Sequence, residues 1–391
     1  MKEIKNLKAA AARIKKAVEN KERIILYGDS DCDGICSVVL LEEAIKSIGG
    51  QVTRTAFPDR ENDGYGITLK ALEVLKPLAP ALFVTLDMGI GNIKEVDIAN
   101  SLGFEVLIID HHQVLERIPS AAIVVDIRQS DDPYPFKEMA NVGITYKLAR
   151  ELIGETISEK VTASFLELTA LATIADMVPQ IEDNKIFIEQ GLASLPFTFR
   201  PALKAFVGIL GQGDVASGAH QQIIAAINAG ESKEFYNDAY ELMTCHEPNK
   251  CRELAEKLLG RVVLKQQHIK EITAEVERRI MSSPSAGSGS ASPIIFEGDP
   301  AWRLVLAGPV ASIIASKYGK PTFIFRKGDE VSVGSVRSLQ EGDNSVNAMR
   351  SCADLLETYG GHPKASGFRI KNENLEQFKK GLEKYFAEHK K

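Results

Sequence analysis

Short β-rich runs alternate with helix-like stretches over the first 130 residues of this chain. The strand-like runs are Ile24–Tyr27, Val52–Phe57, Leu82–Leu86, Val106–Ile109 and Ala122–Val125. Helical patterns lie between them, at Val38–Ser47, Ile67–Leu75 and Ile93–Ser101. Strands separated by helices at this spacing predict βαβ units. We therefore expect an α/β fold with a mostly parallel sheet covered by helices on both faces.

The pattern changes further along the chain. It becomes helical over residues 141–181, and residues 247–280 form one long charged stretch with a thin apolar stripe. A low-complexity segment, Ser282–Pro293, follows. After it we expect strands and helices again. The strands are predicted near Leu304–Leu306, Thr322–Phe325, Val331–Ser335 and Gly367–Ile370, and the helices near Ala311–Tyr318, Val346–Glu357 and Leu375–His389.

Composition supports two globular domains. A chain of 391 residues exceeds the size at which one core usually stops growing, and 44% hydrophobic with 26% charged residues is ordinary for a globular protein. No apolar run approaches the roughly 20 residues that cross a bilayer, and no signal peptide is visible. The five cysteines lack a paired framework. We therefore expect a cytoplasmic protein with reduced thiols and no membrane partner.

The net charge of −6 is unevenly distributed. Residues 283–391 hold 15 Lys and Arg against 12 Asp and Glu, so the negative charge belongs to the first 282 residues. Such an excess indicates either a solvated surface or carboxylates gathered to hold metal.

Acidic side chains follow three predicted strands and one predicted helix. Strand ends of an open α/β sheet meet at one crevice, so we expect these groups to converge. Three carboxylates at alternate positions of one extended segment would repel one another strongly without a cation. Carboxylate oxygens with imidazole suit Mn²⁺ or Mg²⁺. The residues are Asp29, Asp31, Asp33, Asp87, Asp110 and Asp176, with His111 and His112 directly after Asp110.

Simpler explanations exist for each residue alone. A single Asp after a strand is usually a turn or helix-capping residue. The spacing of Asp29, Asp31 and Asp33 also resembles a calcium loop, but the twelfth loop position is Leu40 where a Glu is required. The coincidence of four such placements favours a metal site.

These segments resemble the DHH phosphoesterases. GDSDCDG (Gly28–Gly34), LDMG, IIDHH and ATIADMVP are similar to the four motifs of that superfamily. ENDGYG (Glu61–Gly66) and PYPFKEMANVGITYKLA (Pro133–Ala149) resemble its RecJ branch of single-strand-specific exonucleases, and GSVRS (Gly334–Ser338) and YGGHPKASG (Tyr359–Gly367) resemble the DHHA1 domain. The resemblance implies a DHH catalytic domain over 1–245, a connecting helix over 246–282 and a smaller α/β DHHA1 substrate-binding domain over 283–391, with the active-site cleft between the two domains.

The resemblance also implies roles for individual residues. Asp31, Asp33, Asp87, His111 and Asp176 match the ligands of a two-metal site, in which Asp87 matches the bridging carboxylate; the ions are Mn²⁺ or Mg²⁺. Asp29 matches a further acidic residue that is a candidate ligand or catalytic group. Asp110 and His112 complete the DHH triplet, where the second His lies near the reacting phosphate. The implied substrate-binding residues are Arg337, Ser338, Gly361, His362, Lys364 and Ser366.

Two departures from the RecJ pattern stand out. Many relatives carry a His where this chain has Tyr27, and Tyr is a poor ligand at neutral pH. One metal position then depends on whether Asp29 substitutes. Full-length bacterial relatives also continue into an OB-fold, whereas this sequence stops at Lys391, so a clamp for long single strands is expected to be missing.

Three functions fit these observations. The first is a metal-dependent 5′–3′ exonuclease that releases mononucleotides from single-stranded DNA by two-metal-ion hydrolysis, in DNA repair and recombination. The second is a phosphodiesterase of short oligonucleotides or dinucleotides, and the third is a non-enzymatic replisome scaffold. Two divalent ions about 3.5–4 Å apart suit phosphodiester hydrolysis, and retention of all five matching ligands argues against the scaffold. The 5′ polarity comes from the resemblance alone.

Overall fold

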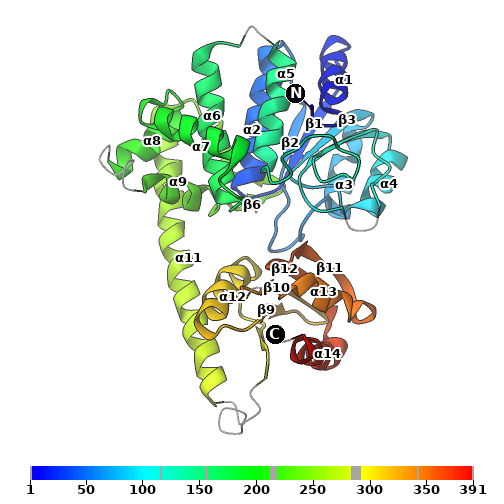
Figure 1. The fold of residues 1–391 in the computed structure, drawn as a ribbon. Coiled ribbons are helices and arrows are strands. Elements are labelled where there is room, and N and C mark those ends of the chain that lie inside the picture. The colour runs from blue at the N-terminus through cyan, green and yellow to red at the C-terminus, as the bar shows by residue number, and fades with distance from the viewer. Residues whose placement is uncertain are drawn as a thin grey trace. The chain divides into compact units, whose positions relative to one another are not determined.

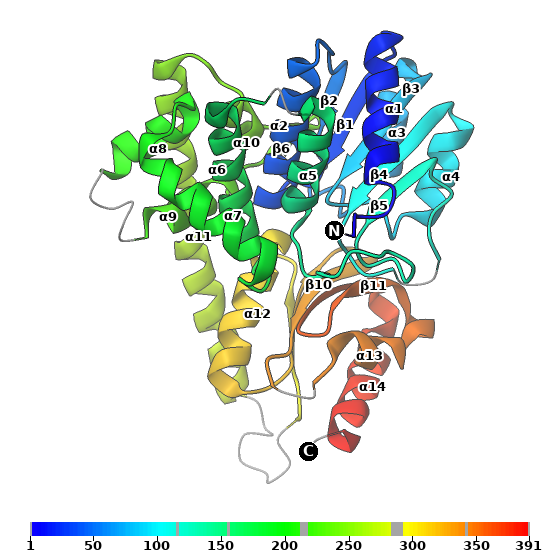
Figure 2. The ribbon, with the colours of Figure 1, turned by 45° about the horizontal axis from the view of Figure 1, so that its top comes forward.

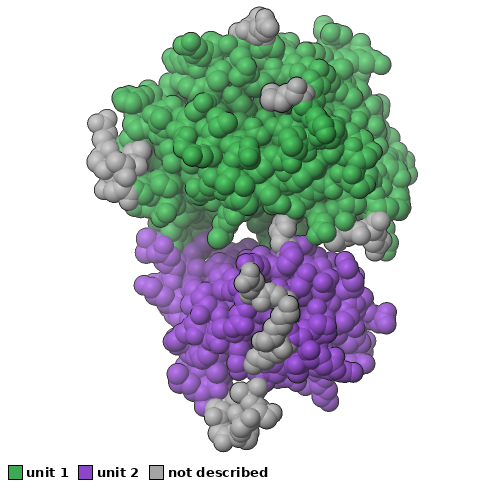
Figure 3. All heavy atoms as spheres, viewed as in Figure 1, with its two compact units in different colours: residues 1–262 green, residues 263–391 purple. Residues whose placement is uncertain are grey.

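The chain forms two compact units, residues 1–262 (unit 1) and 263–391 (unit 2), which are coloured separately in Figure 3. The computed structural model in Figure 1 describes residues 2–114, 117–154, 157–211, 218–282, 292–340 and 343–389. The division between the units falls inside one long helix, α11 (Pro248–Ser282). Leu258 of α11 belongs to the core of unit 1 and Val276 to a core of unit 2. The expected boundaries after residues 245 and 282 remain a prediction.

Unit 1 is built on a five-stranded parallel sheet, as the alternating pattern predicts. Its strand order is β2-β1-β3-β4-β5. The carboxyl end of β1 lies beside that of β3, because Gly28 pairs with Leu86. The strands are β1 (Ile24–Gly28), β2 (Arg54–Ala56), β3 (Ala81–Leu86), β4 (Phe104–Asp110) and β5 (Ile123–Asp126).

Helices cover both faces of this sheet (Figure 2). Successive strand residues point to opposite faces, so Ile24 and Leu26 pack with α1, α2 and α5, whereas Ile25 and Tyr27 pack with α3 and α4. Burial on both faces explains why the strands are continuous apolar runs. The helices are α1 (Leu7–Glu19), α2 (Cys32–Ser47), α3 (Leu69–Leu75), α4 (Ile93–Ser101) and α5 (Asn141–Ile153), with a 3₁₀ turn at Lys76–Leu78.

A helical subregion completes unit 1. Phe165, Leu168 and Leu171 of α6 are buried in the same core as α2 and α5. The elements are α6 (Glu159–Ala175), α7 (Glu182–Ser194), a 3₁₀ turn at Leu195–Phe197, α8 (Pro201–Leu210), α9 (Ala219–Ile227), the two-residue strands β6 (Ser232–Lys233) and β7 (Tyr236–Asn237), and α10 (Asp238–Met243).

Unit 2 is a second α/β unit around a mixed sheet with the order β11-β12-β10-β9-β8. The β8–β9 pair is parallel, whereas the β9–β10, β10–β12 and β11–β12 pairs are antiparallel. A cluster of aromatic side chains, including Phe323, Phe368 and Phe378, fills its core. The elements are β8 (Ile295–Asp299), α12 (Leu304–Tyr318), β9 (Thr322–Lys327), β10 (Val331–Arg337), α13 (Ser345–Arg350), β11 (Leu356–His362), β12 (Ala365–Lys371) and α14 (Leu375–Glu388), with 3₁₀ turns at Ala353–Leu355 and Asn372–Asn374.

Two local predictions in unit 2 were wrong. Leu304–Leu306 is the first turn of helix α12 and not a strand, because Leu304, Ala307, Ala311 and Ile314 are buried at helical spacing. The predicted helix Val346–Glu357 ends at Arg350, and Leu356 already begins strand β11.

No helix in the described part of the chain has the length and apolar character needed to span a bilayer.

Candidate metal centre

The loop after β1 is a tight turn that carries three carboxylates. Gly34 is required there, because a Cβ atom would lie 2.4 Å from the Asp29 carbonyl oxygen. Asp31 is the N-cap of α2 and accepts a hydrogen bond from the Gly34 amide at 3.0 Å. Asp33, in the first turn of α2, is buried and accepts the amides of Asn141 and Val142, both at 2.8 Å. Asp33 therefore also caps the start of α5, which fixes its carboxylate.

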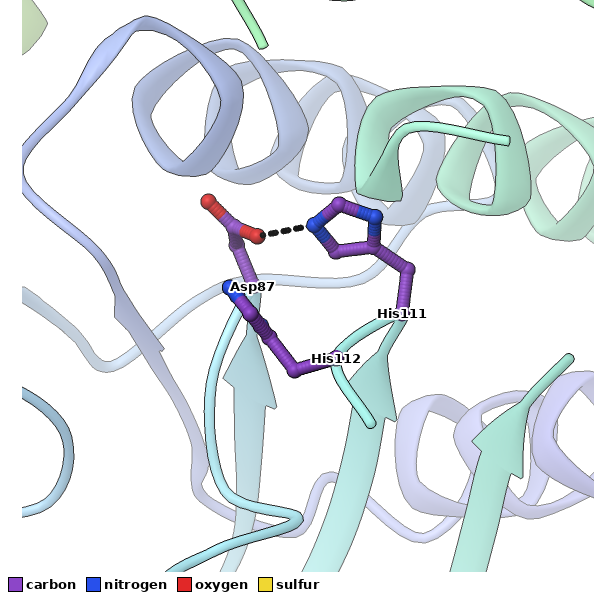
Figure 4. Close-up of side chains that lie close together, drawn as sticks. All are labelled: Asp87, His111 and His112. Atoms are coloured by element: carbon purple, nitrogen blue, oxygen red, sulfur yellow. Dashed lines mark ion pairs between the residues drawn. The ribbon is translucent and has the colours of Figure 1, made fainter. Parts of the chain in front are cut away.

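Asp87 directly follows β3 and adopts a strained backbone conformation. Its φ is +63°, which is uncommon for a residue other than glycine. The side chain is buried, and Oδ1 lies 3.2 Å from His111 Nε2 (Figure 4). Oδ1 has no hydrogen-bond donor among the described residues. Strain of this kind is maintained where the surrounding structure needs a group in one position.

His111 is oriented by a contact on its other ring nitrogen. Nδ1 lies 3.1 Å from the carbonyl oxygen of Met139, and a carbonyl only accepts hydrogen bonds. The hydrogen is therefore on Nδ1, and the lone pair of Nε2 faces Asp87. Two acceptor atoms 3.2 Å apart require a proton or a metal cation between them. A backbone carbonyl behind the imidazole is the usual arrangement for a metal-binding His.

Asp110 does not face the same way as the other carboxylates. It is almost fully buried, accepts the Ile90 amide at 2.9 Å, and its Oδ1 contacts His112 Nδ1 at 2.7 Å. Burial is the largest influence and raises the pKa of Asp110, but the charges of His112 and His111 and the hydrogen bonds from His112 and the Ile90 amide together lower it to about 2. Burial lowers the pKa of His112, but Asp110 outweighs it and raises the pKa to about 9. Asp110 therefore holds His112 as a cation.

Asp176 ends helix α6 and completes the cluster from a separate part of the chain. Its Oδ2 is buried, lies 3.7 Å from His111 Nδ1 and has no hydrogen-bond partner in the described ranges. Met177 after it has a φ of +56° and is exposed. The backbone thus turns sharply at the point where Asp176 is presented.

The carboxylates and imidazoles converge as the strand-end argument predicts. Ligand atoms lie within 4.8 Å of one another in each of three groups. His111 belongs to two of the groups, and so does Asp87. The groups are Asp87 with His111 and His112, Asp33 with His111 and Asp176, and Asp29 with Asp31 and Asp87.

The electrostatics of this cluster favour a cation. Burial raises the pKa of Asp33 and of Asp87 well above the ordinary carboxyl value, and neighbouring carboxylates raise it further. Burial also raises the pKa of Asp176, to about 7, with the charge of Asp31 adding to it. Burial and the neighbouring carboxylates therefore disfavour the charged form of these carboxyls, and a divalent cation would offset both effects. Hard oxygen donors, two of them buried without a hydrogen bond, and an imidazole lone pair fit Mn²⁺ or Mg²⁺.

Arg60 is a residue at this centre that the sequence argument missed. Its guanidinium donates to Asp29 and to Asp31. Burial raises the pKa of both carboxyls. For Asp31, the charge and hydrogen bond of Arg60, the Gly34 amide and the charge of His112 together outweigh burial and lower the pKa, whereas the pKa of Asp29 stays raised. The available signal was the basic residue next to ENDGYG. Tyr27 stands where many relatives carry His. It is fully buried, and its hydroxyl donates to the Gly66 carbonyl at 3.3 Å, so it supports the loop that carries Arg60 and ENDGYG.

The candidate substrate-binding residues of unit 2 lie together at one end of its sheet. Arg337 pairs with Ala365, Gly361 pairs with Ser366, and the Ser338 amide donates to the Lys364 carbonyl at 3.1 Å. The Ser338 hydroxyl is buried without a hydrogen-bond partner in the described ranges, whereas Ser366 contacts the Ser345 hydroxyl at 2.6 Å. Lys364 is exposed. The side chain of His362 lies outside the described part of the structure.

Two glycines at this end are closely approached by their neighbours. A Cβ atom at Gly308 of α12 would lie 3.0 Å from Arg337 Nη2, so the guanidinium lies close against the helix backbone. Gly361 has a φ of +119°, and a Cβ atom there would lie 2.7 Å from the Ala365 carbonyl oxygen.

Comparison with known proteins identifies the family. Residues 23–173 match the DHH family, N-terminal domain, and residues 293–388 match the DHHA1 domain, together more than half of the chain. The chain therefore belongs to the DHH proteins with a DHHA1 domain.

Individual relatives are similar along almost the whole chain. The single-stranded-DNA-specific exonuclease RecJ of Bacillus subtilis is 31% identical over 97% of this chain. A manganese-bound crystal structure of exonuclease RecJ has a TM-score of 0.77 at 27% identity and covers 98% of this chain and 95% of its own. RecJ of Thermus thermophilus in complex with Mn²⁺ has a TM-score of 0.78 at 25% identity, covering 98% of this chain and 55% of its own. The chain spans 48% of the length of the Bacillus subtilis protein.

Proposed function

We propose that this chain is a metal-dependent exonuclease that degrades single-stranded DNA from its 5′ end and releases mononucleotides. The observation that carries the proposal is the convergence of buried carboxylates and an imidazole lone pair at the strand ends of unit 1. The names of its relatives support the substrate, since they are single-stranded-DNA-specific exonucleases. The 5′ polarity and a role in DNA repair and recombination rest on the resemblance to RecJ.

Five residues would hold two divalent ions in this proposal: Asp31, Asp33, Asp87, His111 and Asp176. Asp87 belongs to two of the ligand groups and fits the bridging position. Asp29 is a further candidate ligand, although its carboxylate pairs with Arg60. Bound there, two such ions, Mn²⁺ or Mg²⁺, supply an activated water nucleophile and neutralise charge on the phosphate.

The protein's own groups prepare the reaction around that site. Asp110 fixes the ring of His112 through Nδ1 and keeps it positively charged at neutral pH. Because Nδ1 contacts Asp110, His112 would donate a hydrogen bond or a proton to the substrate through Nε2. We favour the hydrogen bond, which stabilises the negatively charged phosphate, over proton donation. Asp33 and Asp110 are held by backbone amides, so the site needs little reorganisation when substrate binds.

Unit 2 would supply the contacts to nucleic acid. We propose that Arg337 holds a phosphate with its guanidinium and that the buried Ser338 hydroxyl adds a hydrogen bond. Gly361, His362 and Lys364 belong to the same proposed surface, and Ser366 lies beside them with its hydroxyl engaged by Ser345. We also propose a cytoplasmic location, supported by the five free cysteines.

End-labelled digestion tests the function directly. The full chain with Mn²⁺ is incubated with a long single strand, a duplex and a dinucleotide, each as DNA and as RNA and labelled at either end. We expect mononucleotides to be released progressively from the 5′ end of the DNA single strand. Cleavage confined to very short oligonucleotides would replace this proposal with an oligonucleotide phosphodiesterase, and no cleavage of any substrate with Mn²⁺ or Mg²⁺ would contradict enzymatic activity.

A further inference from the structure

The guanidinium of Arg60 lies against two carboxylates of the acidic loop. Nε donates to Asp29 Oδ1 at 2.7 Å, and Nη2 donates to Asp31 Oδ2 at 2.9 Å while also contacting Asp29. The Arg60 side chain is 21% exposed, Asp29 10% and Asp31 34%. Solvent therefore screens this forked pair only in part.

The loop that carries Arg60 is fixed to the acidic loop. Ser30 lies between Asp29 and Asp31 in the sequence, and its hydroxyl donates a hydrogen bond to the Pro58 carbonyl. Asp59 organises the turn by accepting the Glu61 amide at 2.9 Å. The Tyr65 ring lies 4.9 Å from the Arg60 guanidinium. These contacts hold the segment around Arg60 in place, so Arg60 is positioned against the carboxylates and is not a flexible surface side chain.

The oxygens that bind Arg60 overlap with those that would bind metal. Asp29, Asp31 and Asp87 form one of the three ligand groups. Asp31 directs Oδ1 to the Gly34 amide and Oδ2 to Arg60, so both of its oxygens are engaged. A cation that used Asp31 Oδ2 would compete with the guanidinium for the same lone pairs, and its own charge would repel Arg60.

We propose that Arg60 is a built-in counter-cation of the acidic centre, which a divalent metal ion displaces from Asp31. This inference rests on the proposed function, because it takes the acidic centre to be a metal site. Arg60 keeps the carboxylates together before metal arrives and weakens the binding of the ion on the Asp29–Asp31 side. It acts through these carboxylates and is therefore a positioning residue.

The test is the affinity of metal-free protein for Mn²⁺, measured by titration calorimetry on the full chain. Loss of one charge-assisted pair changes an equilibrium about tenfold. Of the two Mn²⁺ ions, the one bound with lower affinity should therefore bind about tenfold more tightly to Arg60→Gln than to wild type. Arg60→Lys, which keeps a charge without the fork, should fall between Arg60→Gln and wild type. Arg54→Gln removes the same charge from an exposed position, where the guanidinium donates to the Glu234 carbonyl, and should match wild type.

The outcomes separate this inference from the proposed function. A wild-type protein that binds no Mn²⁺ would remove both. A wild-type protein that binds Mn²⁺ while Arg60→Gln binds it equally or more weakly would remove only the inference, because a merely structural residue weakens the site when it is lost.

A second measurement is made on the wild-type protein and uses a variant only to assign the signal. In wild-type protein the Arg60 Nε–H resonance, assigned by its absence from Arg60→Lys, should shift when the diamagnetic ion Mg²⁺ saturates the site. An unchanged resonance at saturation would show that the guanidinium stays on Asp29 and Asp31.

Discussion

The two units hold their candidate functional groups in opposite electrostatic situations. In unit 1, burial and mutual repulsion raise the pKa of Asp33 and Asp87, and the Asp87 backbone is strained. In unit 2, Ser366 is hydrogen-bonded to Ser345, and Arg337 donates to the Val336 carbonyl and lies against Gly308. The first arrangement gathers buried groups of one charge, whereas in the second the Ser366 hydroxyl and the Arg337 guanidinium are already engaged by neighbours.

This difference explains why the two sites are not equally easy to identify. A cluster that destabilises the free protein indicates its ligand through the charge that is missing. Polar groups that satisfy one another inside a sheet give no such indication. The proposed substrate-binding role of unit 2 therefore depends more on family membership than the candidate metal centre does.

The largest expected effect comes from Asp87→Asn, which breaks the charged arrangement of unit 1. An amide has one oxygen donor and no charge, so it cannot bridge two cations, and loss of several kcal/mol of transition-state stabilisation corresponds to about 10³-fold in kcat. Turnover of end-labelled single-stranded DNA with Mn²⁺ measures this.

Folding should survive that substitution, because Asn has the size of Asp, tolerates the positive φ and removes a carboxyl whose charged form is disfavoured by burial and by its neighbours. The melting temperature of metal-free Asp87→Asn should equal or exceed that of wild type. Asp97→Asn, at an exposed position of helix α4, is the matched control and should leave both quantities unchanged. Near-normal turnover by Asp87→Asn would contradict the bridging role.

The sequence predicts the convergence of these acidic and imidazole groups because the relevant rule is topological. Parallel strands present their carboxyl ends at one edge, so Asp87 and His111 are placed together once the strands are recognised. Arg60 escapes this rule, since it lies on a loop whose position depends on Ser30, Asp59 and Tyr27. The local pattern also gave a wrong prediction at Leu304–Leu306. Three consecutive apolar residues fit the start of a helix as well as a strand.

Metal binding should stabilise the two units unequally. At a Mn²⁺ concentration of 100 times Kd, binding adds about 2.7 kcal/mol, or roughly 5–10 °C for a unit of this size. Trp302 is the single tryptophan and is buried in unit 2, so its fluorescence reports that unit. The transition seen by calorimetry for unit 1 should rise and fall back with EDTA, whereas the tryptophan transition should move less. An equal shift of both transitions would show that the units unfold together.

Arg337→Ala tests whether unit 2 contacts phosphate. Loss of one charge-assisted contact should raise KM for an oligonucleotide about tenfold and reduce its salt dependence, with Mn²⁺ affinity unchanged. Arg369→Ala is the control, because Arg369 lies on β12, is half-exposed and pairs with Glu357. An unchanged KM for Arg337→Ala would remove this residue from the substrate surface.

The smallest expected effect concerns Ser366, whose hydroxyl is already engaged. If the 2.6 Å contact with Ser345 is its main role, Ser366→Ala should cost about 1 kcal/mol of stability, near 4 °C in the tryptophan-monitored transition, and leave KM almost unchanged. Ser345→Ala should cost a similar amount, and the double variant should cost less than the two single losses combined, because the two residues share one hydrogen bond. A raised KM for Ser366→Ala, with additive losses of stability, would instead indicate that this hydroxyl contacts the substrate. The contrast between buried, repelling carboxylates in unit 1 and hydrogen-bonded polar groups in unit 2 would then weaken.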